Sequence, residues 1–138
     1  MRYLLYMLCI FLFSEAKQFE KSKNIVIDIE HNLMWQDNNE VTQYLETSIT
    51  AEVYCETMIL NGYTDWRVPN IYELLSVIDV KEKNAINKKF LYVNPNIYNT
   101  SSSFIENDDF FLGVDFKSGV ILTDKKINEN YIRCVRDI

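Results

Sequence analysis

The pattern of apolar and polar positions in residues 24–36 predicts two short strands joined by a tight turn. "NIVIDI" (24–29) is rich in β-branched residues, which favour strands, and Leu33, Met34 and Trp35 start a second apolar run. Asn32, just before that run, tolerates the left-handed backbone of a turn. We therefore expect a β-hairpin. His31 falls at its tip, where we expect a solvated turn residue rather than a ligand or a catalytic base.

A helix is predicted over residues 50–60. Apolar side chains recur there at i, i+3, i+4, i+7 and i+8, which is one face of a helix and places Cys55 toward the core. Either Ser48 or Thr50 can cap the start of this helix. Asn61 and Gly62 supply a left-handed stop at its end.

A second helix is predicted to begin at Asn70. Pro69 forces Val68 into an extended conformation, and Asn70 followed by Glu73 three positions on resembles a capping box. Ile71, Leu74, Leu75 and Ile78 then give the apolar face at helical spacing. The turn-forming residues cluster at 61–70 because two helices must be stopped, redirected and restarted within about ten residues.

Trp66 and Arg67 lie on this connection, and two roles are open to them. In a structural role, a buried tryptophan anchors the connection and the arginine forms a bidentate pair with a carboxylate. In a functional role, the tryptophan stacks on a sugar and the arginine binds its hydroxyl groups. The residues alone do not decide between the two.

The last third of the chain predicts strands. They are "FFLGVDF" (110–116), "VILT" (120–123) after a turn at residues 117–119, and "YIRCVRDI" (131–138). Strand alternation in the last of these puts Tyr131, Arg133 and Val135 on one face. Ile132, Cys134 and Arg136 then share the other.

The N-terminus predicts export. Residues 1–16 combine an early arginine, an apolar run too short to cross a bilayer, and small residues at a cleavage site, which is typical of a signal peptide. A retained N-terminal anchor is the alternative, and no later stretch is a transmembrane candidate. We expect residues 17–24 to form a short polar tail and residues 25–138 to form one domain.

Cleavage of the signal would leave two cysteines, Cys55 and Cys134. An even pair in an exported chain predicts a disulfide, with two unpaired buried thiols as the alternative. The net charge of −6 disfavours nucleic acid as a partner. The exception to this acidic balance is a basic patch of Lys81, Lys83, Lys88 and Lys89, for which an ordinary solvated face is the alternative.

Motifs for chemistry are missing. No Ser-His-acid set, phosphate-binding loop or zinc motif can be assembled around a single mature histidine, so we expect neither an enzyme nor a cofactor. Glu106, Asp108 and Asp109 lie close together but lack the alternation and the glycine of a calcium loop, so no metal is expected there.

Several segments in order resemble the Lcl C-terminal domain family, which is named after a collagen-like bacterial adhesin. They are "LMWQD" (33–37), residues 51–79, "VDFKSG" (114–119) and "YIRCVR" (131–136). The resemblance implies a C-type-lectin-like α+β fold with two helices, an antiparallel sheet and paired terminal strands. It also implies a disulfide from the first helix to the last strand, at Cys55 and Cys134.

Within the resemblance we assign a structural role to seven residues: Trp35, Trp66, Arg67, Pro69, Asn70, Glu73 and Arg133. The chain departs from the family pattern at Asn32, where the family has glycine. It departs again at Asn99-Thr100, where the family has an aromatic pair, and any ligand contact made there by relatives is in doubt.

The function that the resemblance implies is that of an exported, non-catalytic bacterial binding module, periplasmic or secreted, that recognises a glycan or an envelope protein. The adhesin suggests sulfated polysaccharide, for which Lys81, Lys83, Lys88 and Lys89 are the candidate contacts, helped by Lys117, Lys125 and Lys126. The alternative is a structural or accessory envelope domain without a small-molecule ligand. A fold alone does not choose between them.

Overall fold

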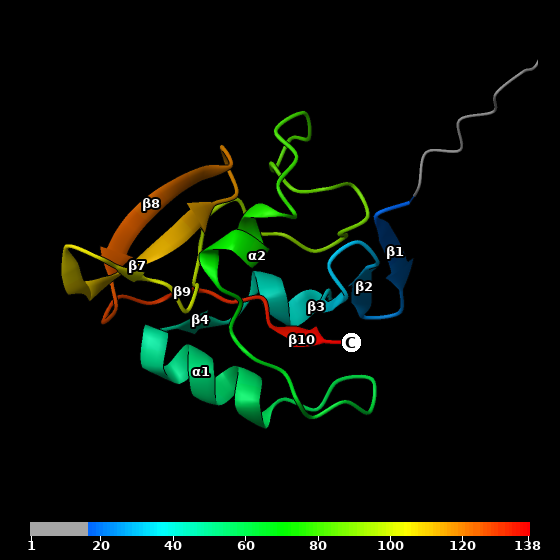
Figure 1. Cartoon of the computed structure of the whole chain (residues 1–138), viewed down its shortest axis with the longest axis horizontal. Coiled ribbons are helices and arrows are strands. Elements are labelled where there is room, and N and C mark those ends of the chain that lie inside the picture. The colour runs from blue at the N-terminus through cyan, green and yellow to red at the C-terminus, as the bar shows by residue number, and fades with distance from the viewer. Residues whose placement is uncertain (1–16) are drawn as a thin grey trace, which may run out of the picture.

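The computed structural model describes residues 17–138, and the signal peptide expected in residues 1–16 lies outside them (Figure 1). The helices are η1 (Asn39–Thr42), α1 (Ser48–Thr57) and α2 (Ile71–Leu75). The strands are β1 (Phe19–Ser22), β2 (Ile25–Asp28), β3 (Leu33–Gln36), β4 (Leu45–Glu46), β5 (Ile97–Tyr98), β6 (Ser103–Phe104), β7 (Asn107–Asp115), β8 (Val120–Lys125), β9 (Asn130–Tyr131) and β10 (Val135–Asp137).

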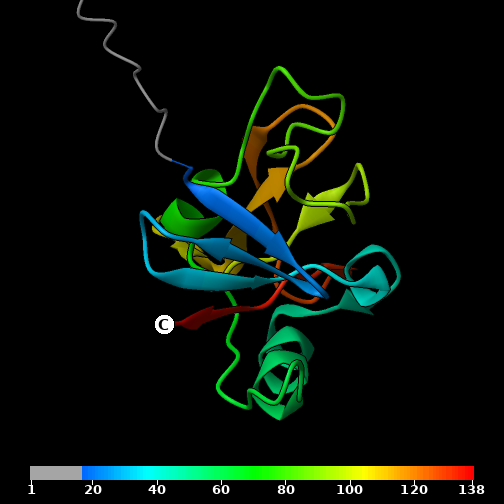
Figure 2. The same ribbon diagram turned by 90° about the vertical axis from the view of Figure 1, so that its right-hand side faces the viewer.

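The first sheet joins the two ends of the described chain. Its order is β1-β2-β3-β10, with every pair antiparallel. Figure 2 shows β10 running beside the N-terminal strands. The expected β2–β3 hairpin is confirmed, and Asn32 in its turn has a φ of 52°. The sharing of one sheet by the first and last strands is confirmed as well.

The polar tail expected at residues 17–24 is wrong for most of its length. Residues 19–22 form β1, which pairs with β2 from Phe19 opposite Asp28 to Ser22 opposite Ile25. The physical reason is Phe19, which is 5% exposed and packs in the core. Lys21 of the same strand contacts Asp37 at 2.6 Å, so one apolar and one charged contact add to the pairing with β2.

The second sheet is mixed rather than purely antiparallel. Its order is β4-β9-β5-β7-β6, with β8 on β7, and the β5–β9 contact is parallel. The β7–β8 hairpin turns where the sequence predicted, with Gly119 at a φ of 78°. A side chain at Gly119 would meet Ile78, Val80 and Ala85, so this turn packs against the segment that follows α2.

Helix α1 differs from its prediction at both ends. Its cap is Thr47, which forms a capping box with Thr50, so the helix starts before the expected residue 50. It ends at Thr57, because Met58 is extended. Asn61 and Gly62 do adopt positive φ, but they form a turn between Leu60 and Tyr63 rather than the helix stop.

Helix α2 begins as predicted and ends early. The Oδ1 atom of Asn70 accepts a hydrogen bond from the backbone amide of Glu73 at 2.8 Å. In return, the backbone amide of Asn70 donates to Glu73 Oε1 at 2.9 Å, which completes the capping box. The helix stops at Leu75. Ile78, expected on its apolar face, instead forms a β-bridge with Ile86 in the following loop.

Residues 131–136 separate two hydrophobic clusters. Val135 belongs to the larger cluster, which includes Trp35, Leu74 and Phe116, and Tyr131 packs against it. Ile132 and Cys134 belong to the smaller cluster, beneath α1 and the 61–70 connection. The predicted alternation of faces is therefore confirmed. The predicted single strand is wrong, because β9 and β10 are separated by three buried residues, 132–134.

The disulfide is confirmed. Cys55 on α1 and Cys134 before β10 are bonded, with their Cα atoms 5.6 Å apart. Both cysteines are fully buried in the smaller cluster. The two helices, the two sheets, the shared sheet of first and last strands and this crosslink together confirm the predicted α+β architecture.

Candidate functional site

Four lysines lie on the long loop between α2 and β5, the first part of which rises to the top of Figure 1. Lys81, Lys83 and Lys88 are exposed, and Lys89 is half-buried. Within residues 17–138 none of these four side chains forms an ion pair. Their ammonium groups are therefore available to a ligand or to solvent.

The turn of the β7–β8 hairpin brings a fifth lysine to this end of the molecule. Gly119 packs against Ile78, Val80 and Ala85, at the start of the lysine-bearing loop. Lys117 lies two residues before Gly119 in the same turn and is exposed. We refer to Lys81, Lys83, Lys88, Lys89 and Lys117 as the lysine surface.

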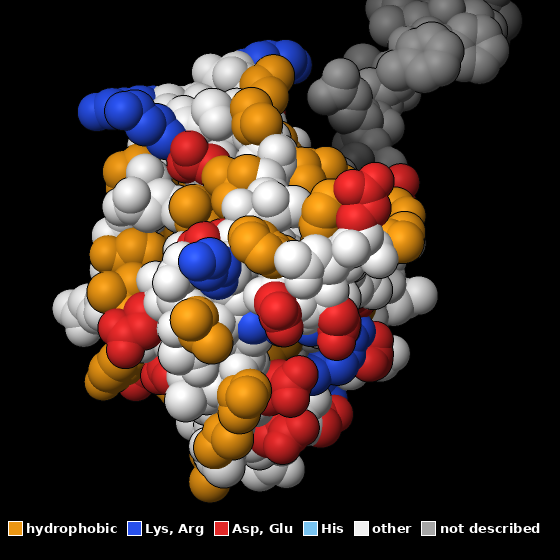
Figure 3. Space-filling model, turned by 90° about the vertical axis from the view of Figure 1, so that its left-hand side faces the viewer, with side chains coloured by type: hydrophobic (Ala, Val, Ile, Leu, Met, Phe, Trp, Pro, Cys, Tyr) orange, Lys and Arg blue, Asp and Glu red, His pale blue; other side chains and the backbone are white. Residues whose placement is uncertain are grey.

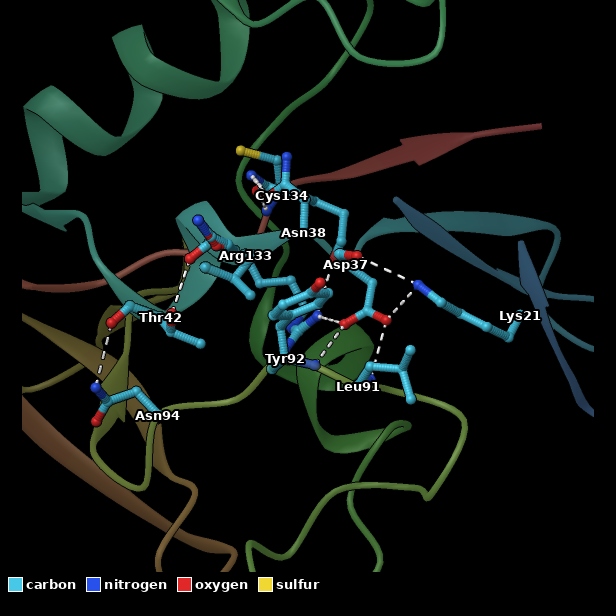
Figure 4. A network of polar contacts seen from close by, with 12 residues as sticks. Lys21, Asp37, Asn38, Thr42, Leu91, Tyr92, Asn94, Arg133 and Cys134 are labelled. Carbon is cyan, nitrogen blue, oxygen red and sulfur yellow. Dashed lines mark hydrogen bonds and ion pairs between the residues drawn. The ribbon is translucent and has the colours of Figure 1, made fainter. Parts of the chain in front are cut away.

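A buried carboxylate fixes the loop just beyond Lys88 and Lys89 (Figure 4). Asp37 is fully buried and accepts hydrogen bonds from the Leu91 amide at 3.0 Å and the Tyr92 amide at 3.1 Å. Two backbone donors of an irregular segment are thus satisfied by one side chain from the end of β3, as buried backbone groups require.

Two cations balance the charge of Asp37. Lys21 on β1 contacts its Oδ2 at 2.6 Å, and the fully buried Arg133 contacts its Oδ1 at 3.2 Å. Arg133 also donates to the backbone oxygens of Gln36, at 2.7 Å, and of Tyr92. Its guanidinium carbon lies 4.9 Å from the centre of the Phe90 ring. Asp37 therefore binds the backbone amides of Leu91 and Tyr92, and Arg133 binds the backbone oxygen of Tyr92. Figure 4 shows these contacts as one network that fixes the loop.

The geometry of Trp66 and Arg67 matches the structural alternative. Trp66 is 2% exposed, so its ring is not free to stack on a sugar, and its Nε1 donates to the Tyr63 carbonyl at 3.1 Å. Arg67 forms a bidentate pair with Glu73, both bonds being 2.7 Å, and further bonds to Asp137 at 2.9 and 3.2 Å. This fork ties the connection to α2 and to the last strand.

These contacts shift the pKa values of Arg67, Glu73 and Asp137. Partial burial of Glu73 opposes its ionisation, but hydrogen bonds from Arg67 and from the Asn70 amide outweigh it, so the pKa of Glu73 is lowered. The hydrogen bond from Arg67 also lowers the pKa of Asp137. Bonds to both carboxylates raise the pKa of Arg67 further above its usual range. All three groups stay charged at neutral pH.

The other residues expected to be structural also lie in the interior or at a helix cap. Trp35 is fully buried in the larger cluster, with its ring edge-on to Phe90. Pro69 is buried, and its carbonyl accepts from the Ser101 amide at 2.9 Å.

His31 and the acidic loop lie at the surface. His31 is exposed at the hairpin tip and contacts Asp28 through Nδ1 at 2.8 Å. Glu106, Asp108 and Asp109 are exposed around the β6–β7 turn, and Asp108 pairs with Lys126 at 3.2 Å. In the described part of the chain, no three His, Cys, Asp or Glu side chains converge in a way that could hold a metal ion.

A cavity of about 180 Å³ lies beside the start of α1. Its lining comes from the start of α1, from the segment after β5, and from residues on other elements; the residues are Ser48, Ile49, Ala51, Glu52, Val68, Asn99, Thr100, Ser101, Ser103, Phe111 and Lys126. Asn99 and Thr100, where the sequence departs from its family pattern, are both buried here. The Lys81–Lys89 patch lies on a different segment, so the structure does not bring these two candidate regions into one site.

The comparison with protein families agrees with this architecture. The family model described as the Lcl C-terminal domain matches residues 24–136. The chain belongs to the Lcl C-terminal domain family. No curated protein matches the sequence. None of the helices in residues 17–138 of this Lcl C-terminal domain is both long and apolar enough to span a bilayer.

Sequence reasoning missed the residues that organise both regions. Asp37 closes the "LMWQD" segment, and a lone aspartate directly after an apolar strand is a signal that could have drawn attention to it. Lys21 was placed in the presumed tail. The role of Asn99 had no local signal, because its contacts come from β4 and β9, more than 30 residues away on either side.

Proposed function

We propose that this Lcl C-terminal domain is an exported, non-catalytic binding module of the bacterial cell envelope, and that its lysine surface contacts an anionic glycan. The observation that carries the proposal is the set of five lysines at one end of an acidic chain. None of the five has an ion-pair partner among residues 17–138. An unpaired ammonium group can bind sulfate or carboxylate without first breaking an internal contact.

The distribution of charge supports contact at this end of the molecule. The net charge of −6 opposes a polyanion, but repulsion from charges more than a Debye length of about 8–10 Å away is largely screened, so the charges near the contact dominate. Figure 3 shows basic side chains projecting at the top of the molecule, with an acidic one beside them. Most of the acidic side chains on this face lie in the lower half, where basic ones are interspersed and where α1 lies in Figure 1. Glu52 and Glu56 of α1 are exposed. A polyanion would therefore approach the lysine end.

The anchoring of the loop also supports binding. The hydrogen bonds from the Leu91 and Tyr92 amides to Asp37 fix the backbone just after Lys88 and Lys89. A surface whose backbone is already ordered loses less conformational entropy on binding than a flexible one. The lysine side chains still have to be ordered, so we expect modest affinity for each contact and a dependence on several contacts at once.

The disulfide supports export. A buried crosslink between α1 and the segment before β10 forms and persists in oxidising compartments, such as the periplasm or the exterior. With the expected signal in residues 1–16, this favours a periplasmic or secreted protein. Purified periplasmic and culture fractions, analysed by intact mass, should contain a chain that starts near residue 17 and has two fewer hydrogens than the reduced form.

The binding proposal is tested with a glycan array that includes sulfated and desulfated forms of the same polysaccharides, read at low and high salt. We expect binding to the sulfated forms, loss of that binding at high salt, and loss in the Lys88→Glu variant. Lys23→Glu is the matched control, because Lys23 is an exposed lysine in the β1–β2 turn. Its backbone carbonyl accepts a hydrogen bond from Asn61 on the 61–70 connection, away from the lysine surface. It makes the same charge change outside the lysine surface.

Two other results would point elsewhere. If no glycan binds and the domain captures a specific envelope protein, the lysine surface or another face recognises a protein instead. If neither a glycan nor a protein partner is found, the structural or accessory role is favoured. Binding that Lys88→Glu and Lys23→Glu weaken equally would contradict the lysine surface as the contact and leave only a net-charge effect.

A further inference from the structure

Strand β8 has an open edge. It pairs with β7 on one side only, and Figure 1 shows it at the outer border of the molecule. With six residues it is the longest edge strand in residues 17–138, because β1 has four, β10 three, and β4 and β6 two each. The edge of β10 is moreover closed by a bridge between Arg67 and Val135. The unpaired backbone groups of an edge strand are a template for another strand.

The free backbone groups of β8 belong to Ile121 and Thr123. Leu112 of β7 lies opposite Thr123, and both of its backbone groups face away from β8. Its amide donates to the Ser102 carbonyl at 2.8 Å, and its carbonyl accepts from the Thr100 hydroxyl. Alternate residues of an antiparallel ladder point their backbone groups to opposite sides. The amides and carbonyls of Ile121 and Thr123 therefore point away from β7, and within residues 17–138 they have no other partner.

The neighbouring positions on this edge are already occupied. Lys125 follows the same alternation, but its amide donates to Asp124 Oδ1 at 2.8 Å and its carbonyl accepts from the Asn128 amide at 3.0 Å. At the other end, the Gly119 amide donates to the Asp115 carbonyl at 2.7 Å. The open edge thus consists of two residues, each with one free donor and one free acceptor.

This edge is also apolar and lacks the usual protection. Val120 and Ile121 are 57% and 45% exposed, and Leu122 is half-buried. Natural edge strands are commonly protected from association by proline, by bulges or by charged side chains. Strand β8 contains no proline, its register with β7 is regular through all six pairs, and its charged residues, Asp124 and Lys125, come only at its end. Such an edge is suited to pairing with a further strand.

A second copy of β8 matches the free groups when a two-fold axis passes through Leu122. Ile121 of each copy then lies opposite Thr123 of the other, and their amides and carbonyls form four hydrogen bonds. An axis at Ile121 would instead place Lys117 opposite Lys125, so like charges would meet. An axis at Thr123 would pair Ile121 with Lys125, whose backbone groups are already used.

The distribution of charge favours the same arrangement. The turn end of the β7–β8 hairpin carries Lys117 and packs on the lysine-bearing loop, whereas its open end has more acidic residues than lysines. The residues at the open end are Glu106, Asp108, Asp109 and Asp124, with Lys125 and Lys126. In an antiparallel pair the turn end of each copy lies beside the open end of the other, so ends of opposite net charge meet twice.

We propose that two copies of this chain associate through antiparallel pairing of β8, with the two-fold axis at Leu122, so that their second sheets become one continuous sheet. The association should be weak. A pair of six-residue strands covers less than the roughly 1,200 Å² of a standard interface, so we expect a dissociation constant on the order of 0.1 mM. High salt should weaken it further, because the contact between the charged ends is screened.

The dimer does not rest on the proposed function. It needs no glycan, and no residue of the lysine surface belongs to β8. It is measured without a glycan, so failure of one proposal does not imply failure of the other.

Sedimentation velocity of the folded, disulfide-bonded chain tests the association. The parent should shift from monomer to dimer as its concentration rises through the expected dissociation constant. Thr123→Pro removes an amide that faces away from β7, so the hairpin can be retained, while the dimer loses two of its four hydrogen bonds. We expect a dissociation constant raised about tenfold or more. Leu122→Lys places two ammonium groups at the axis, should abolish the dimer, and decides the question if Thr123→Pro does not fold.

Cysteine crosslinking tests the register. Residues opposite each other in a non-hydrogen-bonded pair have Cα atoms about 4.5 Å apart, which a disulfide can span. Leu122 is its own partner at the axis, so Leu122→Cys should give a disulfide-linked dimer on a non-reducing gel. Val120→Cys is the matched control, because Val120 is more exposed but lies opposite Asp124 of the other copy, and it should stay monomeric. The native Cys55–Cys134 bond is fully buried and does not take part.

The proposal is overturned if the parent stays monomeric at every concentration. It is also overturned if folded Thr123→Pro or Leu122→Lys dimerises as the parent does, which would place the contact on another face. Crosslinking of Val120→Cys as fast as that of Leu122→Cys would overturn it too, because exposure alone would then explain the disulfide.

Discussion

The two faces of residues 131–136 hold two irregular parts of the chain by different means. On one face Cys134 is bonded to Cys55, and the 61–70 connection packs over this bond through Trp66 and Val68. On the other face Arg133 and its partner Asp37 hold the lysine-bearing loop through backbone hydrogen bonds. Adjacent residues thus secure one segment covalently and the other with buried charge.

This difference matches what each segment contains. The connection has Trp66, Pro69 and a capping box, so apolar packing and local hydrogen bonds can hold it. The loop also buries apolar side chains, among them Ile86 and Phe90, but the backbone amides of Leu91 and Tyr92 need an acceptor from elsewhere. A buried carboxylate provides two acceptor oxygens at once, but only when cations such as Lys21 and Arg133 offset its desolvation.

The largest expected effect comes from breaking the covalent side. Replacing both Cys55 and Cys134 by serine should lower the free energy of unfolding by about 4–5 kcal/mol, because a 79-residue separation is released in the unfolded chain. Urea unfolding of the variant and of the parent measures this loss. A midpoint unchanged from that of the oxidised parent would contradict it, and the reduced parent should match the variant.

Removing the buried charge pair should lower the free energy of unfolding slightly less than removing the disulfide. Asp37→Ala leaves Arg133 buried without its counter-charge, and such a loss is typically about 3–5 kcal/mol. We also expect limited proteolysis to cut first within residues 76–96. Asp65→Ala is the matched control, since Asp65 pairs with Arg136 at the surface, and its effect should be far smaller. Equal losses in the two variants would refute the role of burial.

The capping box sharpens the comparison on the connection side. Asn70→Ala removes the acceptor for the Glu73 amide and should destabilise the domain by about 1 kcal/mol, whereas Asn70→Ser should retain most of the stability. Thermal unfolding of the three proteins measures the order. If serine is no better than alanine, the side-chain cap is not the cause.

Acid should weaken the Arg67 fork. The pKa of Glu73 is lowered in the folded state, so its contribution is present above its ordinary value of 4.5 and is lost as the pH falls through the lower folded value. We expect this part to be below about 1 kcal/mol, because Arg67 is partly exposed. Denaturant unfolding from pH 7 to pH 3 should show a smaller decline in Glu73→Gln than in the parent.

The smallest effect on stability is expected at the lysine surface. Lys88→Glu should change the free energy of unfolding by no more than about 0.5 kcal/mol, because Lys88 is exposed and has no ion-pair partner among residues 17–138. The same urea experiment measures it. A larger loss would mean that the loop depends on this lysine for its fold, and any lost ligand binding would then be indirect.

Prediction from sequence succeeded where the signal is local. The β2–β3 hairpin follows from Asn32, the start of α2 from Asn70 and Glu73, and the β7–β8 turn from Gly119, because each depends on residues within a few positions. Prediction failed for β1. Its strand conformation depends on pairing with β2 and on a buried place for Phe19, which the polar sequence around it does not indicate.

The candidate sites divide in the same way. The four loop lysines could be found from the order of residues in the sequence, because a charge cluster is a local property. Lys117 was expected to help them, but only the packing of Gly119 on the start of the loop brings it to the same end of the molecule. The cavity beside α1 could not be found, because Asn99, Ser48 and Lys126 lie far apart in sequence and meet only in the folded chain.

The sequence by itself determined the class of fold, the family and the two cysteines that pair, since these follow from periodicity, ordered motifs and count. Tertiary structure decided which buried polar groups are satisfied and which are not. The Asp37 carboxylate acquired four partners and the Asn99 oxygen none among residues 17–138, although both are short polar residues directly after strands. The physical reason is that hydrogen bonding in the interior depends on the positions of distant atoms, to within a few tenths of an ångström, and only the packed chain sets them.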